Sequence, residues 1–562
     1  MMKKILLLFF CLLFALQCSA ADITITDDFE VEVNKDALLA ALYEADIPSL
    51  RKALDLRLIT CEELTRYYLE RIEAYDKTFN CFITLCDNAI DIAKERDEAM
   101  LRGLDEGSLF GIPIVVKDNV MYEGYPTTNG VAYLRPNPST QNAAIVQYLL
   151  DEGAIILGKT NMSAAAQDAI CSTNASGLQT FNAYNENLAS GGSSGGSAVA
   201  VSLNFAAAGI GTDTNASLRY PAALNGCITL RPTLGRIERD GCIILNYSRD
   251  TAGAITRSVL DQAIMLDVMT LGKYNFEENL NAEVLKGIRL GVLSELSYPI
   301  EGSYNREEND LDNEIQAAFD NAVKELESCG AEIITVSMPT VLNDFYVNSD
   351  NNSRLYSKLE KMLDDNGLDA VIYPTYLHTP HYTTPEYLNG KSIYDRPYIC
   401  NCAGFSPLTG APEIGIPIGR HSLGAGISME VLARKEDDQM LLDIAYSYML
   451  QYDHREPSPI APSLYNSELP IDLHAFLMMY EQAVISAEQM EIASTQPPET
   501  IPVTLPPIIE ETELVQPQSE PEPKKASAIS IGYYIIPCAC ILAGVAYVFY
   551  RRKKNSRLIS DF

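Results

Sequence analysis

The stretch at residues 191–197, which reads Gly-Gly-Ser-Ser-Gly-Gly-Ser, constrains the fold of this chain more than any other. Four glycines around serines allow backbone conformations that other residues avoid, and they let neighbouring segments approach closely. Residues 198–208 follow directly and are mostly small and apolar, unlike the sequence beside a flexible Gly/Ser linker. The pattern predicts a buried helix and strand after a tightly packed turn.

Lys117 ends a second informative stretch. The apolar residues 112–116 before it are typical of a buried strand, where the charged form of an amine is disfavoured. Burial lowers the pKa of a lysine below its free value of about 10.4, and a neutral amine is a usable base. With Ser193 and Ser217, and without a nearby histidine, Lys117 is able to complete a proton relay that ends in a nucleophilic hydroxyl. This combination predicts acyl transfer.

Ser217 lies in a third stretch, residues 211–219, directly after Thr214, Asn215 and Ala216. Successive backbone N–H groups at such a position are able to face a developing oxyanion. The alternative is a tight surface turn without a catalytic role.

Together these stretches resemble the amidase signature family of serine hydrolases. The 24 positions from Ser193 to Ser217 match the interval that the family keeps between its two serines. The resemblance runs from about residue 36 to about residue 451, and it includes residues 54–72, 153–163, 368–375 and 415–419.

The resemblance implies a role for each site residue. Ser217 resembles the nucleophile, Ser193 the bridging serine whose peptide bond to Gly192 is cis, and Lys117 the base. No metal and no cofactor is required. The oxyanion hole is implied at the backbone amides of Thr214, Asn215, Ala216 and Ser217. Structural support is implied for Asp213, Arg219 and Ser194.

Hydrophobic periodicity predicts an α/β fold. Residues 285–293 are typical of a strand, residues 313–329 of a helix and residues 331–337 of the next strand. The resemblance implies a mixed, mostly parallel, twisted sheet of about eleven strands sandwiched by helices. With 47% hydrophobic residues in 562, the chain is able to bury one large catalytic domain, and its net charge of −33 disfavours nucleic-acid partners.

Both ends of the chain carry predicted targeting segments. Residues 1–20 have the charged start, apolar middle and small exit residues of a secretory signal peptide, with a lipid anchor at Cys18 as the alternative. Residues 528–550 are uncharged and long enough for a transmembrane helix, with a buried soluble helix as the alternative. The basic start of residues 551–562 predicts a cytoplasmic tail.

Residues 496–527 are rich in Pro and Glu and predict an extended stalk, with a polyproline site for a partner as the alternative. Residues 21–495 then form the predicted catalytic domain, held outside the cell by a single membrane span. The predicted function is hydrolysis of a carboxylic amide C–N bond through an acyl-enzyme. Candidate substrates are fatty and aryl amides, C-terminal peptide amides and N-acyl amino acids, with pocket residues expected in 122–133 and 376–402.

Two other functions come from the same resemblance. The family includes the glutaminase-type subunit of the transfer-RNA amidotransferase, which a signal peptide and outward topology disfavour. The family usually has Gly-Gly before the nucleophile, whereas this chain has Asn215 and Ala216, whose Cβ atoms restrict positive φ. The alternative function is therefore a catalytically degenerate surface binding protein with the amidase fold.

Nine of the 13 cysteines lie outside the predicted signal and membrane segments. Cys81 with Cys86, or Cys400 with Cys402, are close enough in sequence to pair or to bind metal, but no four-ligand set accompanies them. Buried free thiols are the prediction.

Overall fold

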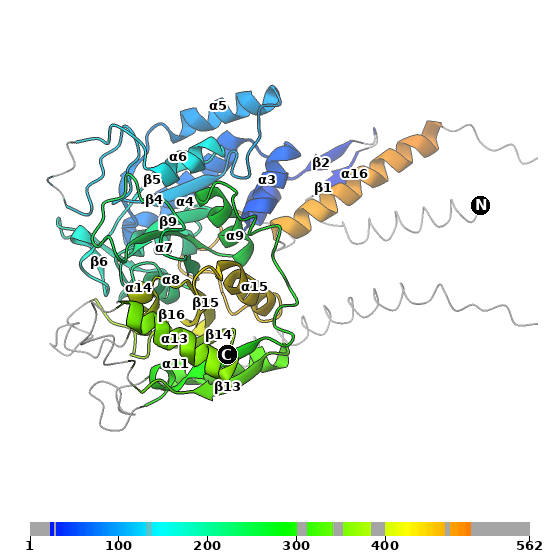
Figure 1. The fold of residues 1–562 in the computed structure, drawn as a ribbon. Helices are drawn as coiled ribbons and strands as arrows, with labels where there is room; N and C mark the ends of the chain where they lie inside the picture. Colours follow the sequence, from blue (N-terminus) through cyan, green and yellow to red (C-terminus); the bar gives the residue numbers. More distant parts are fainter. Residues whose placement is uncertain are drawn as a thin grey trace, which may run out of the picture. The chain divides into compact units, whose positions relative to one another are not determined.

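The computed structural model of the protein describes residues 23–495, with gaps at 27, 29, 132, 134–136, 300–311, 340, 342–351, 384–399 and 467–471. An eleven-stranded sheet runs through the described residues (Figure 1). In order across the sheet, its strands are β13 (Glu332–Val336), β12 (Arg289–Leu293), β14 (Ala370–Pro374), β16 (Gly426–Leu432), β15 (Glu413–Arg420), β10 (Ile228–Arg231), β11 (Thr251–Thr256), β9 (Ala208–Asp213), β4 (Pro113–Lys117), β5 (Ile155–Thr160) and β3 (Phe82–Leu85).

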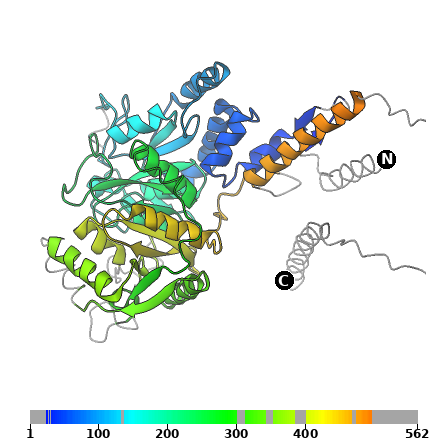
Figure 2. The same cartoon turned by 45° about the vertical axis from the view of Figure 1, so that its right-hand side comes forward.

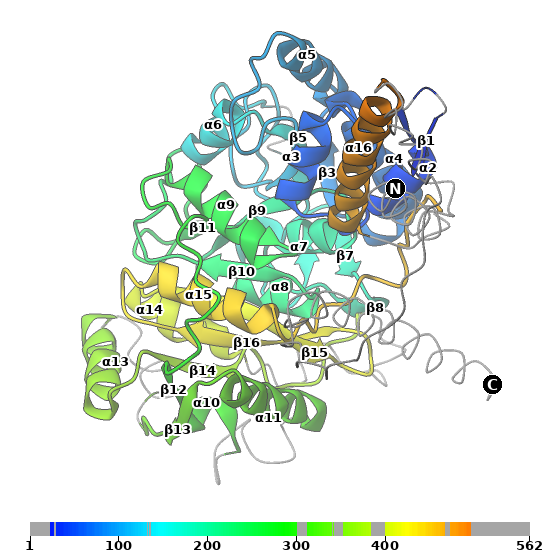
Figure 3. The same cartoon turned by 90° about the vertical axis from the view of Figure 1, so that its right-hand side faces the viewer.

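Helices pack against the large sheet, and Figure 3 shows α9 and α15 in front of its central strands. The helices are α2 (Lys35–Ala41), α3 (Ile47–Asp55), α4 (Cys61–Phe79), α5 (Ala89–Leu101), α6 (Ala144–Asp151), α7 (Gly195–Ser202), α8 (Arg219–Leu224), α9 (Val259–Met269), α10 (Ser294–Ser297), α11 (Asn313–Ser328), α13 (Asn352–Asn366), α14 (Phe405–Thr409), α15 (Asp438–Met449) and α16 (Leu473–Thr495). Short 3₁₀ turns occupy Ala164–Ala166 and Asn401–Ala403. Two small sheets comprise β1 (Ile23–Ile25) with β2 (Val31–Val33), and β6 (Ser172–Thr173) with β7 (Gln179–Asn182) and β8 (Asn185–Ala189).

The large sheet is mixed. The pairs β13–β12, β12–β14, β9–β4 and β4–β5 are parallel, and they lie toward the two ends of the sheet. The six other neighbouring pairs, which include all of those in the middle, are antiparallel. Parallel neighbours need a crossover, which α11 supplies between β12 and β13 and α6 between β4 and β5, whereas β15 and β16 form a hairpin. The predicted α/β class is confirmed, and the prediction of a mostly parallel sheet is wrong.

Local sequence signals account well for single elements. Helix α4 begins at a capping box in which Thr60 and Glu63 satisfy each other's backbone N–H, and it ends at Asn80 with a left-handed φ of 56°. Helix α11 and strand β13 match the predicted helix and strand to within one residue at each end. Strand β12 begins at Arg289, four residues later than predicted.

The glycine-rich stretch leads into α7, and β9 follows it, as predicted. All eight residues of α7 are buried. A Cβ on Gly209 would lie 3.1 Å from Val201, and one on Gly211 would lie 2.9 Å from Ser194 Oγ, so these two glycines let α7 lie directly on β9. Helix α7 also contacts β4, and its N-cap residue Ser194 lies 2.8 Å from Lys117 at the end of that strand.

Helix α16 lies alongside α2, α3 and the β1–β2 hairpin (Figure 2). Among the residues that the structure describes, no helix combines the length and apolar character that a membrane crossing needs. The predicted signal peptide (1–20), stalk (496–527), transmembrane helix (528–550) and tail (551–562) lie outside the described residues.

The nine cysteines of the described residues form no disulfide bond, and eight of them are buried. Cys400 Sγ and Cys402 Sγ lie 3.1 Å apart. The prediction of burial is therefore confirmed for eight of them, whereas Cys242 is partly exposed.

Candidate active site

Lys117 ends β4 and is fully buried. Its Nζ lies 2.7 Å from Ser193 Oγ, 2.8 Å from Ser194 Oγ and 3.0 Å from Thr212 Oγ1. Strand β4 pairs in parallel with both β5 and β9, so the lysine comes from the inside of the sheet. Within the described part of the chain, Lys117 forms no ion pair. Its partners are hydroxyl and carbonyl oxygens.

This environment sets the protonation of Lys117. Burial lowers the pKa of Lys117 from its ordinary value of 10.5 to about 7, while the charges of Asp213 and Asp250 raise it. Desolvation outweighs the two carboxylates because neither of them pairs directly with the amine. An amine with this pKa exists in both forms near neutral pH.

The two serines beside Lys117 have different hydrogen-bond partners. Ser194 Oγ donates to Thr212 O at 3.2 Å, so its proton is committed and its contact with Lys117 is as an acceptor. For Ser193 Oγ, Lys117 Nζ is the only hydrogen-bond partner among the described residues. A neutral amine offers one lone pair, and the Ser193 hydroxyl is placed to donate to it. The peptide bond from Gly192 to Ser193 is cis, the conformation that the resemblance implies.

Ser217 lies in the loop between β9 and α8. Ser194 N donates to Ser217 O at 3.1 Å, which holds this loop beside the two serines. Ser217 is 8% exposed, and its hydroxyl makes no hydrogen bond to any described residue. The backbone N–H groups of residues 214–217 likewise donate to no described acceptor. Four successive free donors beside a serine hydroxyl are suited to an anion.

Asn215 and Ala216 do not create the steric conflict expected from the loss of Gly-Gly. Neither residue has a positive φ, so the loop does not use the backbone region that a Cβ restricts. Asn215 makes two contacts, and only the second depends on its side chain. Its carbonyl accepts from Arg219 Nη2 at 2.7 Å, and its side-chain Oδ1 accepts from Arg249 Nη1 at 3.1 Å.

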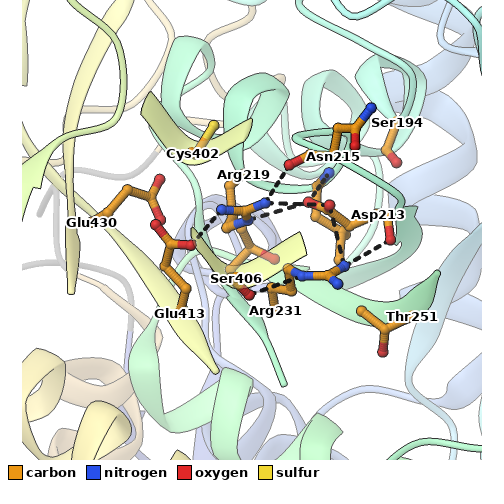
Figure 4. Close-up of polar contacts among 12 residues, drawn as sticks. Ser194, Asp213, Asn215, Arg219, Arg231, Thr251, Cys402, Ser406, Glu413 and Glu430 are labelled. Carbon is orange, nitrogen blue, oxygen red and sulfur yellow. Dashed lines mark hydrogen bonds and ion pairs between the residues drawn. The ribbon is translucent and has the colours of Figure 1, made fainter. Parts of the chain in front are cut away.

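Buried charges hold both ends of this loop. Arg219 lies between Asp213 and Glu413 (Figure 4). Its guanidinium nitrogens are 3.2 Å from the Asp213 carboxylate and 2.7 Å from the Glu413 carboxylate. Asp213 Oδ2 also accepts from Leu218 N at 3.1 Å, and Arg231 Nη1 donates to Asp213 O at 2.8 Å. Burial raises the pKa of Asp213, but the charges of Arg219 and Arg231 lower it by more, so the pKa lies below its ordinary value. The carboxylate therefore stays charged and paired.

A cavity of about 100 Å³ borders the same loop. Thr212 and Thr214 connect it to the reaction centre. Its lining residues are Asn119, Asn129, Ala165, Ala166, Gln167, Thr212, Thr214, Ile243, Ile244, Leu245 and Asp250. Two larger pockets, of about 650 Å³ and 410 Å³, are lined by none of the predicted site residues. Position rather than size therefore makes the small cavity the candidate substrate site.

The structure brings Lys117, Ser193 and Ser194 into contact and places Ser217 beside them. It joins Asp213 and Arg219 in one ionic cluster, and it places Thr214 at the cavity. The predicted link between Ser193 and Ser217 is absent, because no hydrogen bond joins the two hydroxyls. Among the described residues, no group of three or more His, Cys, Asp or Glu side chains is arranged to hold a metal.

Sequence reasoning missed several residues of the site. They are Thr212, Asn119, Asp250, Arg231 and Glu413. Thr212 directly precedes Asp213, and Asn119 lies two residues after Lys117, so closeness in the chain was an available signal for both. Glu413 meets Arg219 from 194 positions away, and no local pattern marks such a contact. The predicted pocket region 122–133 contributes Asn129, while residues 243–250 were not predicted.

Comparisons with known proteins point to one family. The sequence model of the family described as Amidase matches residues 63–346. The A-type subunit of glutamyl-tRNA(Gln) amidotransferase from Lawsonia intracellularis is 38% identical over 290 residues, which are 50% of this chain and 57% of that protein. The corresponding protein from Persephonella marina is 30% identical over 63% of this chain and 78% of its own length. The alignment with the Lawsonia protein thus spans little more than half of that relative.

Solved structures agree on the fold. Peptide amidase from Stenotrophomonas maltophilia superposes with a TM-score of 0.65 at 25% identity, covering 75% of this chain and 99% of the amidase. A bacterial aryl acylamidase of the amidase signature enzymes has a TM-score of 0.61 at 18% identity, over 78% of this chain and 98% of its own, and shows likeness of fold alone.

Proposed function

The chain belongs to the amidase family, and on that premise we propose that it hydrolyses the C–N bond of a carboxylic amide through Lys117, Ser193 and Ser217. The observation that carries the proposal is a fully buried lysine whose Nζ contacts only hydroxyl and carbonyl oxygens. A lysine without a carboxylate partner is a base, because nothing compensates its charged form.

Acylation begins with attack of Ser217 Oγ on the amide carbonyl carbon. The Ser217 proton passes to Ser193 Oγ while the Ser193 proton passes to neutral Lys117 Nζ, so each hydroxyl loses one proton and Ser193 regains one. The Ser217 hydroxyl, free of other hydrogen bonds, turns toward Ser193 when substrate binds; such contacts are often unmade in unliganded enzymes. The tetrahedral oxyanion accepts from the unpaired N–H groups of residues 214–217.

Collapse of the intermediate breaks the C–N bond. Lys117 returns its proton through Ser193 to the departing nitrogen, which leaves as an amine or ammonia, and Ser217 keeps the acyl group as an ester. Water then attacks the ester, the relay accepts its proton, and the carboxylic acid leaves as Ser217 regains its hydrogen. The ionic cluster of Asp213, Arg219 and Glu413 keeps the loop in place through both half-reactions.

A fluorophosphonate probe tests this proposal on the full-length protein. We expect one adduct, mapped by peptide analysis to Ser217, and much slower labelling in Lys117→Ala. Ser217→Ala should remove the adduct, whereas Ser248→Ala, which changes an exposed serine, should leave it. An adduct elsewhere, or labelling that does not depend on Lys117, contradicts the relay.

We also propose that the enzyme is held outside the cell by a single C-terminal membrane span. The support is the signal-peptide pattern of residues 1–20, the uncharged residues 528–550 and the basic residues 551–554. Protease added to intact expressing cells should remove the catalytic domain and leave an epitope at the C-terminus protected. Digestion only after lysis contradicts this topology.

Two observations bear on the other candidate functions. The unbonded Ser217 hydroxyl is compatible with a catalytically degenerate binding protein, and the labelling experiment separates the two because such a protein acquires no adduct. The second candidate function is that of the relatives named as amidotransferase subunits, and it would require this chain to act with transfer RNA. A net charge of −33 repels a phosphate backbone, so we propose that this chain acts without nucleic acid.

A further inference from the structure

The cavity beside the oxyanion loop has an unusual polar lining. Three of its residues, Asn119, Asn129 and Asp250, each carry a buried side-chain oxygen with no hydrogen-bond partner among the described residues. Asn119 and Asp250 are only 2% and 6% exposed. A buried acceptor without a donor costs about 1–3 kcal/mol, so three around one cavity point to a ligand that supplies donors.

The other side-chain polar atoms of Asp250 and Asn119 are already engaged. Asp250 Oδ2 accepts from Leu245 N and Asn246 N, which leaves Oδ1 without a donor. Asn119 Nδ2 donates to Thr212 Oγ1 at 2.9 Å, and the same hydroxyl contacts Lys117 Nζ. The cavity is thus connected to the catalytic lysine through a single side chain.

A buried ion pair builds the wall that carries Asn129. Asp118 pairs with Lys159 and accepts from Thr128 N at 3.1 Å and Gly130 N at 3.4 Å. Asn129 N also donates to Asp118 O at 3.0 Å. These contacts hold Asn129 at a left-handed φ of 52°. Asn129 therefore lies in a turn that is held in place by hydrogen bonds to Asp118.

Charge narrows the class of ligand. Asp250 is the only charged side chain that lines the cavity, and Lys117 is not paired with it. The nearby Arg249 guanidinium donates to Asn215 Oδ1 on the oxyanion loop. Three acceptors, one of them anionic, match the three N–H donors and the positive charge of an ammonium group.

We propose that this cavity is a subsite for an ammonium group, and that the substrate is an amide with an amino group close to its scissile carbonyl. The inference rests on the proposed function, since it names the substrate class of the same site. A volume of about 100 Å³ is roughly that of three water molecules, which suits an aminoalkyl group of a few heavy atoms. The partly exposed Leu245 at the rim is placed to contact an apolar part of the substrate.

L-alaninamide and isobutyramide test the subsite because they have the same shape and differ by an ammonium in place of a methyl. Binding is measured to full-length Ser217→Ala protein, which does not turn over either compound. We expect L-alaninamide to bind at least about tenfold more tightly, the effect of one hydrogen bond to a charged group. Equal affinity, tighter binding of isobutyramide or no detectable binding of L-alaninamide overturns the inference.

Two further variants locate the effect. Asp250→Asn keeps an acceptor for Leu245 N and Asn246 N but replaces the free carboxylate oxygen, so the preference for L-alaninamide should fall to about twofold or less. Asn129→Gly removes an acceptor while allowing the positive φ, and it should lower the preference by a smaller factor. Asp240→Asn, an exposed carboxylate on the neighbouring loop that does not line the cavity, should change nothing.

The two proposals fail separately. Wild-type protein that hydrolyses amides through Ser217 without preferring L-alaninamide contradicts only the ammonium subsite. Protein that binds L-alaninamide selectively but acquires no fluorophosphonate adduct contradicts the amidase proposal and keeps the subsite.

Discussion

Lys117 and Lys159 are buried on neighbouring strands of the sheet, yet their partners differ. Both are fully buried near the ends of two parallel strands, with Val116 opposite Lys159 and Lys117 opposite Thr160. Lys159 lies 3.5 Å from the Asp118 carboxylate, whereas Lys117 contacts only hydroxyl and carbonyl oxygens. Burial lowers the pKa of both amines below the ordinary lysine value, and direct pairing with the Asp118 carboxylate opposes that shift at Lys159. The partner, rather than burial, separates a structural cation from a base.

The largest expected effect comes from removing each amine in turn. Lys117→Met should lower kcat/KM for amide hydrolysis by about 10³-fold, because general-base catalysis contributes about 10²–10⁴-fold. Lys159→Met, its matched control on the neighbouring strand, should cost less than about tenfold in protein that is folded. Similar losses in the two variants would break the comparison.

Stability should show the opposite order. Asp118→Asn breaks a buried pair and leaves Lys159 without its carboxylate, which should lower the free energy of unfolding by about 3 kcal/mol. Lys117→Met removes an amine that has no counter-ion, and it should change that free energy by less than about 1 kcal/mol. Urea midpoints of the two variants measure the difference. A larger loss in Lys117→Met would mean that its amine is a structural cation.

The sequence predicted the burial of Lys117 but had no means to rank it above Lys159 by pattern alone. Apolar residues precede both lysines, at 112–116 and 154–157, so hydrophobicity treats them alike. The resemblance to the amidase signature family singled out Lys117. Sequence pattern also predicted α11, β13 and the buried helix after the glycine-rich stretch, because their signals are local.

Local sequence patterns did not predict contacts between segments that lie far apart in the chain. The sheet's antiparallel middle depends on how β10, β11, β15 and β16 pair, which their own sequences do not encode. The contact of Glu413 with Arg219 and the free oxygens of Asn119 and Asp250 arise only once those strands and loops meet. The expected restriction of positive φ does not arise at Asn215 and Ala216, because neither residue has a positive φ.

Replacing each of the two serines beside Lys117 tests which of them passes a proton to the base. Ser193→Ala removes the hydroxyl whose only described partner is Lys117, and it should lower kcat/KM by about 10²-fold. Ser194→Ala removes a hydroxyl whose proton is committed to Thr212 O, and about tenfold is expected. Steady-state kinetics on both variants decide the order, and a greater loss in Ser194→Ala would move the relay to that serine.

The smallest effect is expected in the oxyanion loop. Restoring glycine in the double variant Asn215→Gly, Ala216→Gly should change kcat/KM by less than about threefold, because neither residue has a strained φ. The same kinetic assay measures it. A large gain from near zero activity would instead support the catalytically degenerate alternative.

The pH dependence of kcat/KM tests the central claim most directly, because it reports the ionisation of the free enzyme. Lys117 acts as a base only when neutral, so activity should rise with pH, pass its half-maximum at about pH 7, where the pKa of Lys117 lies, and level off above it. Lys117→Met should lose that step. A rise centred near the ordinary lysine value of 10.5, or an unchanged step in Lys117→Met, would contradict the account.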